Sequence, residues 1–149
     1  MSDNFFILVA EDDENDAFIL QRAFTKAGIL DPFHIVSDGQ EVMDYLSGSE
    51  KYADRNLYPL PNLAILDIKM PKKNGFEALE WTRQQRHLDS LPVMMLSSSG
   101  EPTDIEKAYQ LGANAYMFKT ADIEQMTTAL KKACFFWKET VLASGLAVA

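Results

Sequence analysis

Five short apolar segments alternate with amphipathic helical patterns along the chain, and this alternation is the feature that most constrains the fold. The apolar segments are residues 5–10, 33–36, 63–66, 92–96 and 115–118. Strands that alternate with helices predict a parallel sheet with helices on both faces, and right-handed crossovers leave few topologies. We therefore predict a doubly wound α/β fold with a five-stranded parallel sheet in the order 2-1-3-4-5, whose switch point lies between the first and third strands.

Helix-start and helix-stop residues support these divisions. Asp13 can cap a helix that runs through Ala27, and Gly28 is placed to end it. The polar stretch from Ser47 to Asn62 contains two prolines and predicts a long surface loop. The remaining helix signals lie at Gly48, Gly75, Gly112 and Asp122.

Composition bounds the class of protein. A chain of 149 residues with 47% hydrophobic residues predicts one globular domain, with a core over about 5–135 and a helical extension over 136–149. A formal net charge of -8 disfavours nucleic acid or an anionic membrane as a direct partner. The single cysteine, Cys134, excludes an internal disulfide and favours a reducing compartment, so we expect a cytoplasmic protein without a signal peptide or a membrane span.

Charged side chains follow the carboxyl ends of three predicted strands. Glu11 and Asp12 follow the first strand, Asp67 the third and Lys119 the fifth. Ligands of open α/β sheets bind outside these strand ends, and carboxylates gathered there repel one another unless a cation is present. Mg²⁺ prefers such oxygen ligands. We expect Asp12 and Asp67 as direct ligands, Glu11 through a water, and a backbone carbonyl just after Asp67, that of Lys69.

Asp67 is also the candidate nucleophile of this site, because a carboxylate can attack phosphorus and form an acyl phosphate. Lys119 would pair with Asp67 before the reaction and with a phosphate oxygen after it. Ser97 could donate its hydroxyl to another phosphate oxygen, and Ser98 its backbone N–H.

Each of these residues alone has a simpler interpretation. Asp67 could be a turn former, Lys119 a solvated lysine, and the acidic run after the first strand could be ordinary charge at a helix N-terminus. Asp13 and Asp16 are interpreted in that way, as cap and first-turn charges. A functional site is favoured only because the remaining residues, Glu11, Asp12, Asp67, Ser97 and Lys119, are all placed at strand ends on one edge of the predicted sheet.

Four motifs, in order and spacing, resemble the CheY-like receiver domain of bacterial two-component response regulators over residues 5 to about 135. The motifs are Val9-Ala10-Glu11-Asp12-Asp13, Leu66-Asp67-Ile68-Lys69-Met70-Pro71, Leu96-Ser97-Ser98 and Tyr116-Met117-Phe118-Lys119. The resemblance implies that a histidine kinase phosphorylates Asp67, that the domain catalyses only its own phosphorylation and slow dephosphorylation, and that Ser97 and Tyr116 form a switch pair. Segments 36–46 and 136–141 further resemble the single-domain regulators that accompany bacterial phytochrome kinases.

This resemblance implies a phosphorelay protein that acts through a downstream protein target or a phosphotransfer protein, without a DNA-binding output domain. One position departs from the family pattern. Receiver domains usually carry a proline after the lysine, often with a cis peptide bond, whereas this chain has Thr120. A cis bond costs about 2.5–4 kcal/mol before any other residue. The conformation of the Lys119–Thr120 bond, and hence the reach of Lys119, is left open by the sequence.

Three other functions fit the sequence less well. A magnesium phosphatase with an aspartate nucleophile usually has a second acid two residues later, where this chain has Lys69. A flavodoxin-like electron carrier would need a phosphate-binding loop after the first strand, where Glu11 and Asp12 would repel phosphate. A receiver-like scaffold that is never phosphorylated is favoured only by Thr120.

The last predicted helix carries more apolar residues than one face needs. Met126, Leu130, Ala133, Trp137 and Val141 follow helical spacing and can cover the sheet, whereas Phe135 and Phe136 fall largely off that stripe. Large exposed apolar patches mark interaction sites. We therefore expect a homodimer through this helix; the alternative is that both phenylalanines fold back against the preceding helix or the tail.

Overall fold

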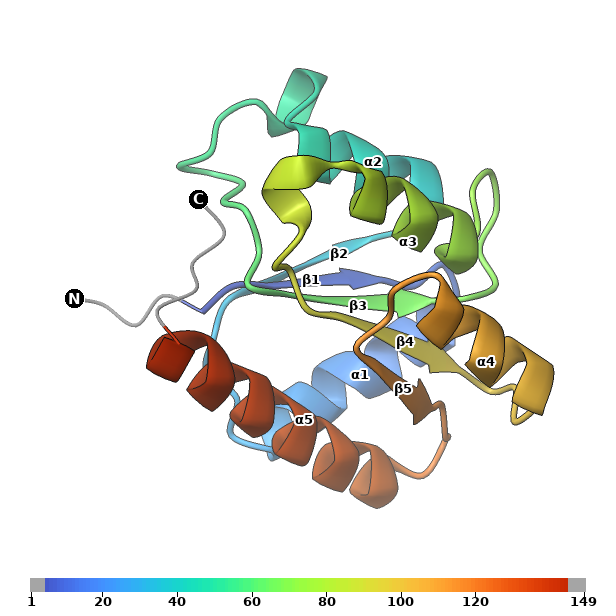
Figure 1. Cartoon of the computed structure of the whole chain (residues 1–149). Coiled ribbons are helices and arrows are strands. Elements are labelled where there is room, and N and C mark those ends of the chain that lie inside the picture. The colour runs from blue at the N-terminus through green and yellow to red at the C-terminus, as the bar shows by residue number, and fades with distance from the viewer. Residues whose placement is uncertain (1–4, 145–149) are drawn as a thin grey trace.

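The computed structural model describes residues 5–144, which form one parallel five-stranded sheet with helices on both faces (Figure 1). The strands are β1 (Ile7–Ala10), β2 (Phe33–Val36), β3 (Leu63–Asp67), β4 (Val93–Ser97) and β5 (Ala115–Phe118). All four strand pairings are parallel and the order is β2-β1-β3-β4-β5. The predicted fold class and strand order are confirmed.

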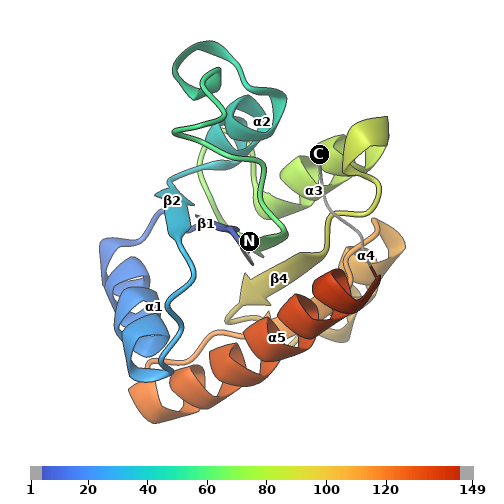
Figure 2. The same ribbon diagram turned by 90° about the vertical axis from the view of Figure 1, so that its left-hand side faces the viewer.

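Five helices cover the sheet in two layers. They are α1 (Glu14–Lys26), α2 (Gly39–Ser47), α3 (Gly75–Gln84), α4 (Pro102–Gln110) and α5 (Ile123–Ser144), with short 3-10 turns at Glu50–Tyr52 and Arg86–Leu88. Helices α1 and α5 pack together on one face, and α2 and α3 pack together on the other (Figures 1 and 2). Helix α4 joins the α2–α3 side, because its Ala108 is buried in the same core.

The predicted helix signals act as caps. The side chain of Asp13 accepts a hydrogen bond from the Asp16 backbone N–H at the start of α1. Asp122 likewise accepts from the second and third backbone N–H groups beyond it, at 2.9 and 3.1 Å. Gly48 ends α2 in the left-handed conformation, with φ of 74°, which glycine adopts at no steric cost.

Each strand sends alternate side chains to two separate cores, as the period of a strand requires. Ile7 and Val9 are buried with α1 and α5, whereas Leu8 and Ala10 are buried with α2 and α3. Strands buried on both faces explain the nearly continuous apolar runs in the sequence. The sheet is therefore a rigid platform whose carboxyl ends can hold side chains in fixed positions.

The segment 47–62 was expected to be a polar surface loop, but its two tyrosines pack inward against other side chains. Tyr52 is only 2% exposed and Tyr58 is half-buried; both rings pack with Tyr45 and His34. The Tyr52 hydroxyl donates a 2.6 Å hydrogen bond to Glu41 Oε2. Burial, reinforced by this bond, raises the pKa of Tyr52, while burial lowers the pKa of His34. The polar composition of the loop concealed aromatic side chains that extend the α2–α3 core.

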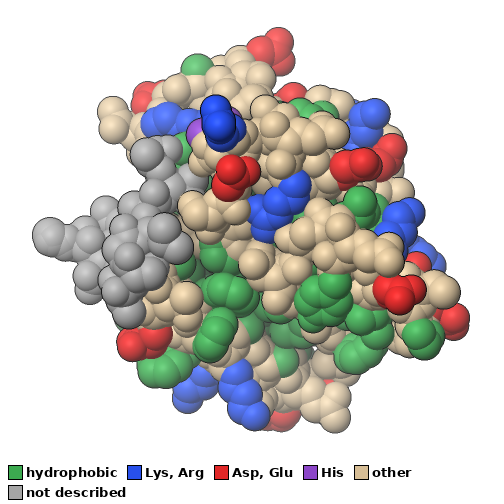
Figure 3. All heavy atoms as spheres, viewed as in Figure 1, with side chains coloured by type: hydrophobic (Ala, Val, Ile, Leu, Met, Phe, Trp, Pro, Cys, Tyr) green, Lys and Arg blue, Asp and Glu red, His purple; other side chains and the backbone are tan. Residues whose placement is uncertain are grey.

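Helix α5 buries the predicted stripe and exposes two phenylalanines. Met126, Leu130 and Val141 are buried, whereas Phe135 is 68% and Phe136 is 56% exposed. Apolar side chains gather over the region of α4, β5 and α5 in the lower half of Figure 3. Within the described residues, the two rings therefore do not fold back into the core.

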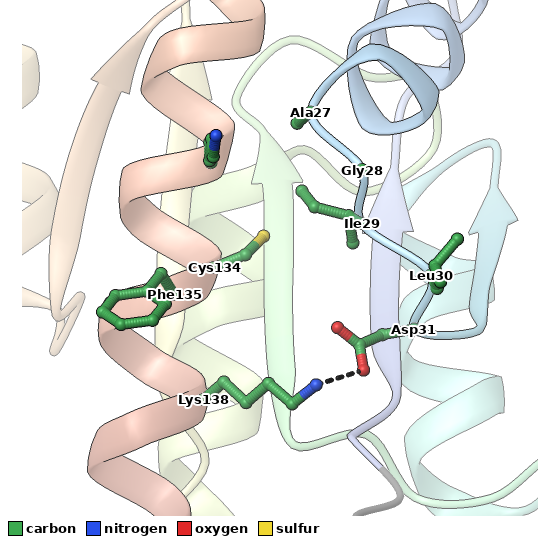
Figure 4. A pocket seen from close by; sticks show the side chains of 9 residues that line it. Ala27, Gly28, Ile29, Leu30, Asp31, Cys134, Phe135 and Lys138 are labelled. Carbon is green, nitrogen blue, oxygen red and sulfur yellow. Dashed lines mark hydrogen bonds and ion pairs between the residues drawn. The ribbon is translucent and has the colours of Figure 1, made fainter.

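A hollow of about 300 Å³ separates α5 from the segment 27–31 that joins α1 to β2 (Figure 4). Lys138 Nζ spans it to Asp31 Oδ1 at 2.9 Å. Cys134 lies at its base, only 4% exposed, and burial raises the pKa of its thiol to about 12. Cys134 therefore belongs to the core between the sheet and helices α1 and α5.

The predicted boundary between a core over 5–135 and an extension over 136–149 stays a prediction. Helix α5 passes through residues 135 and 136 without interruption and is described to Ser144. Residues 145–149 lie outside the described residues. No helix in the described part is both long and apolar enough to cross a membrane.

Gly75 brings the start of α3 against the end of β3, and this contact generates the first prediction. A Cβ at Gly75 would lie 2.2 Å from the Asp67 carbonyl oxygen and 2.9 Å from Ile68 Cα. We expect Gly75→Ala to destabilise the protein by about 1–3 kcal/mol, because backbone must move to relieve the overlap. Gly75 is the first residue of α3, so the change gains less there than the about 1 kcal/mol of helix propensity that it brings in a helix interior.

Urea unfolding measures this difference. Gly100→Ala is the matched control, because its added Cβ would meet only the Phe118 ring at an ordinary 3.6 Å. Equal unfolding midpoints for the two variants would contradict the steric role of Gly75.

Candidate functional site

The register of the sheet brings the charged strand ends together. Ala10 of β1 lies opposite Leu66 of β3, so the residues that follow them, Glu11 and Asp67, are neighbours. The Lys119 backbone N–H donates to the Ser97 carbonyl at 2.7 Å, which joins the ends of β5 and β4. The predicted site residues on four different segments therefore meet at one edge of the sheet.

Three carboxylates gather at this edge. Glu11, Asp12 and Asp67 each offer an oxygen, and these oxygens all lie within 4.8 Å of one another. Glu11 is 3% and Asp67 4% exposed, whereas Asp12 is open to solvent. Buried like charges this close are stable only with a proton, a cation or a basic side chain between them.

Lys119 supplies a positive charge among these carboxylates. Its Nζ lies 2.9 Å from Glu11 Oε1 and 3.1 Å from Asp67 Oδ2, and its side chain is only 15% exposed. A third carboxylate, Asp16, lies 2.9 Å from the same nitrogen. The Lys119–Thr120 peptide bond is trans, since the described residues contain no cis bond, and Lys119 nevertheless reaches Asp67.

The pKa values of Glu11 and Lys119 are shifted from their ordinary values. Burial raises the pKa of Glu11 to about 7, and the negative charge of Asp67 adds to this, although the Lys119 ammonium opposes it. Burial alone would lower the pKa of Lys119, but its close contacts with the carboxylates of Glu11 and Asp16 outweigh burial and raise it. Lys119 is thus held as an ammonium, while burial makes the ionised form of Glu11 costly without further positive charge.

The residues present fit a hard divalent cation. Glu11 Oε1 is buried and has no hydrogen bond, since the nearby Lys119 ammonium is not aligned to donate to it. A buried acceptor left without a donor is costly, and a cation would satisfy it. The donor set of three carboxylates is the oxygen chemistry that Mg²⁺ prefers.

Hydroxyl groups border the site on the side of β4. Ser97 is buried, and its Oγ accepts a hydrogen bond from the Ser99 backbone N–H at 3.0 Å. The Tyr116 hydroxyl donates to the Ser99 carbonyl at 2.9 Å. Ser97 and Tyr116 are therefore not in direct hydrogen-bond contact but are joined through the backbone of Ser99.

A hollow of about 230 Å³ unites most of the predicted residues. It is lined by Glu11, Asp12, Asp13, Asp16, Asp67, Lys69, Ser97, Ser98 and Lys119. Tyr116 is half-buried and not part of the lining. The side chain of Lys69 is exposed, so a role for this residue rests on its backbone carbonyl, as predicted.

Two participants were missed from the sequence. Asp16 was interpreted as a first-turn charge, yet it contacts Lys119. Its position three residues after the Asp13 cap was an available signal, because side chains of the first turn lean back toward the helix N-terminus. Ser99 contributes mainly backbone groups, which side-chain motifs do not reveal.

Comparison with known proteins agrees with this geometry. Residues 7–131 match the response regulator receiver domain family. Response regulator Rcp1 of Synechocystis is 31% identical over 91% of this chain and 90% of its own length. Its Mn(2+)-bound crystal structure superposes with a TM-score of 0.79, over 92% of this chain and 96% of that one.

Two further solved structures are similar. The phosphorylated cyanobacterial phytochrome response regulator RcpA has a TM-score of 0.83 and 32% identity, over 92% of this chain and 96% of that one. Response regulator RPA3017 of R. palustris, from red light signaling, has a TM-score of 0.84 and 36% identity, over 89% of this chain and 93% of that one. The chain belongs to the response regulator receiver domain family and is similar to the phytochrome response regulators within it.

Proposed function

We propose that Asp67 is the phosphoacceptor of this response regulator and that the reaction depends on Mg²⁺. The observation that carries the proposal is the buried Asp67 carboxylate, 3.1 Å from the Lys119 ammonium and within one carboxylate cluster with Glu11 and Asp12. Lys69, two residues after Asp67, supplies no general acid, which counts against a hydrolytic phosphatase.

In the proposed reaction, an Asp67 oxygen attacks the phosphorus of a phosphohistidine on a sensor kinase. A new P–O bond forms, and the P–N bond breaks with its electron pair left on the histidine nitrogen. Lys119 donates to a phosphoryl oxygen, and Ser97 can donate its hydroxyl to another. Attack of water on the acyl phosphate then releases phosphate and regenerates Asp67, so catalysis is limited to the domain's own phosphorylation state.

Asp12, Asp67 and Glu11 would hold the Mg²⁺, Glu11 through a water, with the Lys69 backbone carbonyl. When bound, the cation neutralises the carboxylates and favours approach of an anionic phosphoryl group. The similar Rcp1 structure is of a Mn(2+)-bound form of that protein, which supports a divalent cation here.

Ser97 and Tyr116 would form the switch. Movement of the Ser97 hydroxyl toward a phosphoryl group on Asp67 would break its bond to the Ser99 N–H. Ser99 also accepts from the Tyr116 hydroxyl, so a displaced Ser99 would reposition the aromatic ring. The expected result is a changed surface over α4, β5 and α5.

The partners follow from the family and its similar members. A histidine kinase is the phosphoryl donor that the family implies, and the similarity to the phytochrome response regulator RcpA favours a phytochrome-type kinase. A downstream protein target or a phosphotransfer protein would receive the signal. We place this exchange in the cytoplasm, which the lone, unpaired Cys134 supports.

A homodimer through the α5 region is the second part of the proposal. Phe118, Phe135 and Phe136 are each more than half exposed, and Leu30, across the hollow from Phe135, is 94% exposed (Figure 4). Patches of this kind mark interaction sites. If the α4–β5–α5 surface forms the interface, the Tyr116 switch would couple phosphorylation to association.

The first prediction of this section tests Asp67. Incubation with acetyl phosphate and Mg²⁺ should raise the intact mass by one phosphoryl group, whereas EDTA should prevent the increase because the carboxylates then repel the donor. Asp67→Asn should remain unmodified. Glu77→Gln, on the exposed start of α3, is the control and should be modified like the wild type. Equal phosphorylation of Asp67→Asn would refute the assignment.

The second prediction concerns Lys119→Ala. We expect this variant to bind Mg²⁺ at least as tightly as the wild type, because a positive neighbour of the carboxylates is lost. Without metal, the free energy of unfolding of the variant should fall by about 3–5 kcal/mol, because the buried carboxylates of Glu11 and Asp67 lose their positive partner. Protonation of Glu11 reduces this loss at lower pH.

Urea unfolding in EDTA and in MgCl₂ measures both effects. Lys69→Ala is the matched control, because it removes an exposed lysine at the same edge and keeps the backbone carbonyl. If the Lys119→Ala protein folds but Mg²⁺ does not stabilise it, Lys119 is needed for metal binding and the prediction is wrong.

The third prediction tests the dimer by sedimentation equilibrium with and without beryllofluoride. The wild type should associate, more strongly with beryllofluoride, and Phe135→Ala/Phe136→Ala should be monomeric because it loses exposed apolar area. Phe18→Ala removes another exposed ring, on α1, and should leave association unchanged. A wild type that stays monomeric in both states refutes the dimer. A dimer indifferent to beryllofluoride refutes only its regulation.

A further inference from the structure

The Lys119 ammonium is shared by three carboxylates, and one of them stands outside the metal cluster. Nζ donates to Asp16 Oδ2 at 2.9 Å and to Asp67 Oδ2 at 3.1 Å, and lies 2.9 Å from Glu11 Oε1. Asp16 is absent from the group of carboxylates whose oxygens converge within 4.8 Å, which comprises Glu11, Asp12 and Asp67. Asp16 is therefore a partner of the lysine rather than a ligand of the site.

The position of Asp16 is set by α1 and not by the reacting groups. Its backbone N–H donates to Asp13 Oδ1 at 3.0 Å, which fixes it in the first turn. Its side chain is 32% exposed, whereas that of Lys119 is 15% exposed. The pair thus joins α1 to the end of β5 across 103 residues of sequence.

We propose that Asp16 is a positioning residue that holds the Lys119 ammonium beside Asp67 throughout the phosphorylation cycle. The inference rests on the proposed function of Asp67. Phosphorylation changes the charge and position of the oxygens that Asp67 presents, and a cation held by the cluster would weaken the pull of the Glu11 carboxylate on the ammonium. Asp16 alone among the three partners keeps the same carboxylate in the same place.

The need for such an anchor follows from the chemistry of lysine. A lysine side chain has a flexible stem with many rotamers and carries three donors on a compact charge. A cation in the carboxylate cluster would repel the ammonium from the site. A fixed acid on α1 opposes that displacement and keeps one donor free to meet a phosphoryl oxygen.

The test is the initial rate of phosphorylation by acetyl phosphate at saturating Mg²⁺, followed by intact mass. Asp16→Ala should slow the reaction roughly threefold to tenfold, because Lys119 then has to be ordered by the phosphoryl group itself. Glu14→Ala is the matched control: it removes an acid from the same exposed helix turn and should leave the rate unchanged.

The Asp16→Ala effect should vanish in a Lys119→Ala background, whereas a purely structural effect would persist there.

Urea unfolding in EDTA gives a readout that is independent of phosphorylation. The midpoint shift caused by Asp16→Ala should be larger with Lys119 present than in Lys119→Ala, because only then is an ion pair lost. Equal midpoint shifts with and without Lys119 would overturn the positioning role. A phosphorylation rate that Asp16→Ala leaves unchanged or increases would also overturn it. A wild type that takes up no phosphoryl group would instead overturn the proposed function itself, and this role with it.

Discussion

The ion pairing of Lys119 is the interaction on which the site depends. Glu11 and Asp67 are buried carboxylates at adjacent strand ends, and their mutual repulsion would oppose folding without a nearby positive charge. Lys119 supplies that charge from β5, the far edge of the sheet. Because the ammonium is shared among three carboxylates, a cation could neutralise part of the cluster, and the ammonium could then pair with a phosphoryl oxygen while Asp16 still balances its charge.

Close backbone approaches hold the loops around this pair. Gly75 lies so near β3 that a side chain would overlap the Asp67 carbonyl. Gly39, at the start of α2, donates its N–H to the Lys73 carbonyl at 2.8 Å, and a Cβ there would lie 2.2 Å from that oxygen. The loop after Asp67 is thus clamped between two helix N-termini, which limits how far the reactive carboxylate can move.

The same architecture links the site to a surface. Ser97 at the site and Tyr116 toward the α4–β5 surface are both bonded to the backbone of Ser99. The Ser99 hydroxyl in turn donates to Asp104 of α4 at 2.8 Å. A change at Ser97 therefore has a short covalent and hydrogen-bonded route to α4, which contacts β5, the strand that carries the exposed Phe118.

Local sequence patterns determined the strands and the residues that end them, because apolar periodicity and caps such as Asp13 act within a few residues. The strand order followed from general rules on how alternating strands and helices connect. The identity of the pair Asp67 and Lys119 was also predictable from strand ends alone. Only the tertiary structure decided that Asp16 joins this pair, that the bond before Thr120 is trans, and that Tyr52 is buried beneath a polar loop. These features depend on contacts between segments distant in sequence, whose geometry follows from packing and charge balance and not from any local pattern.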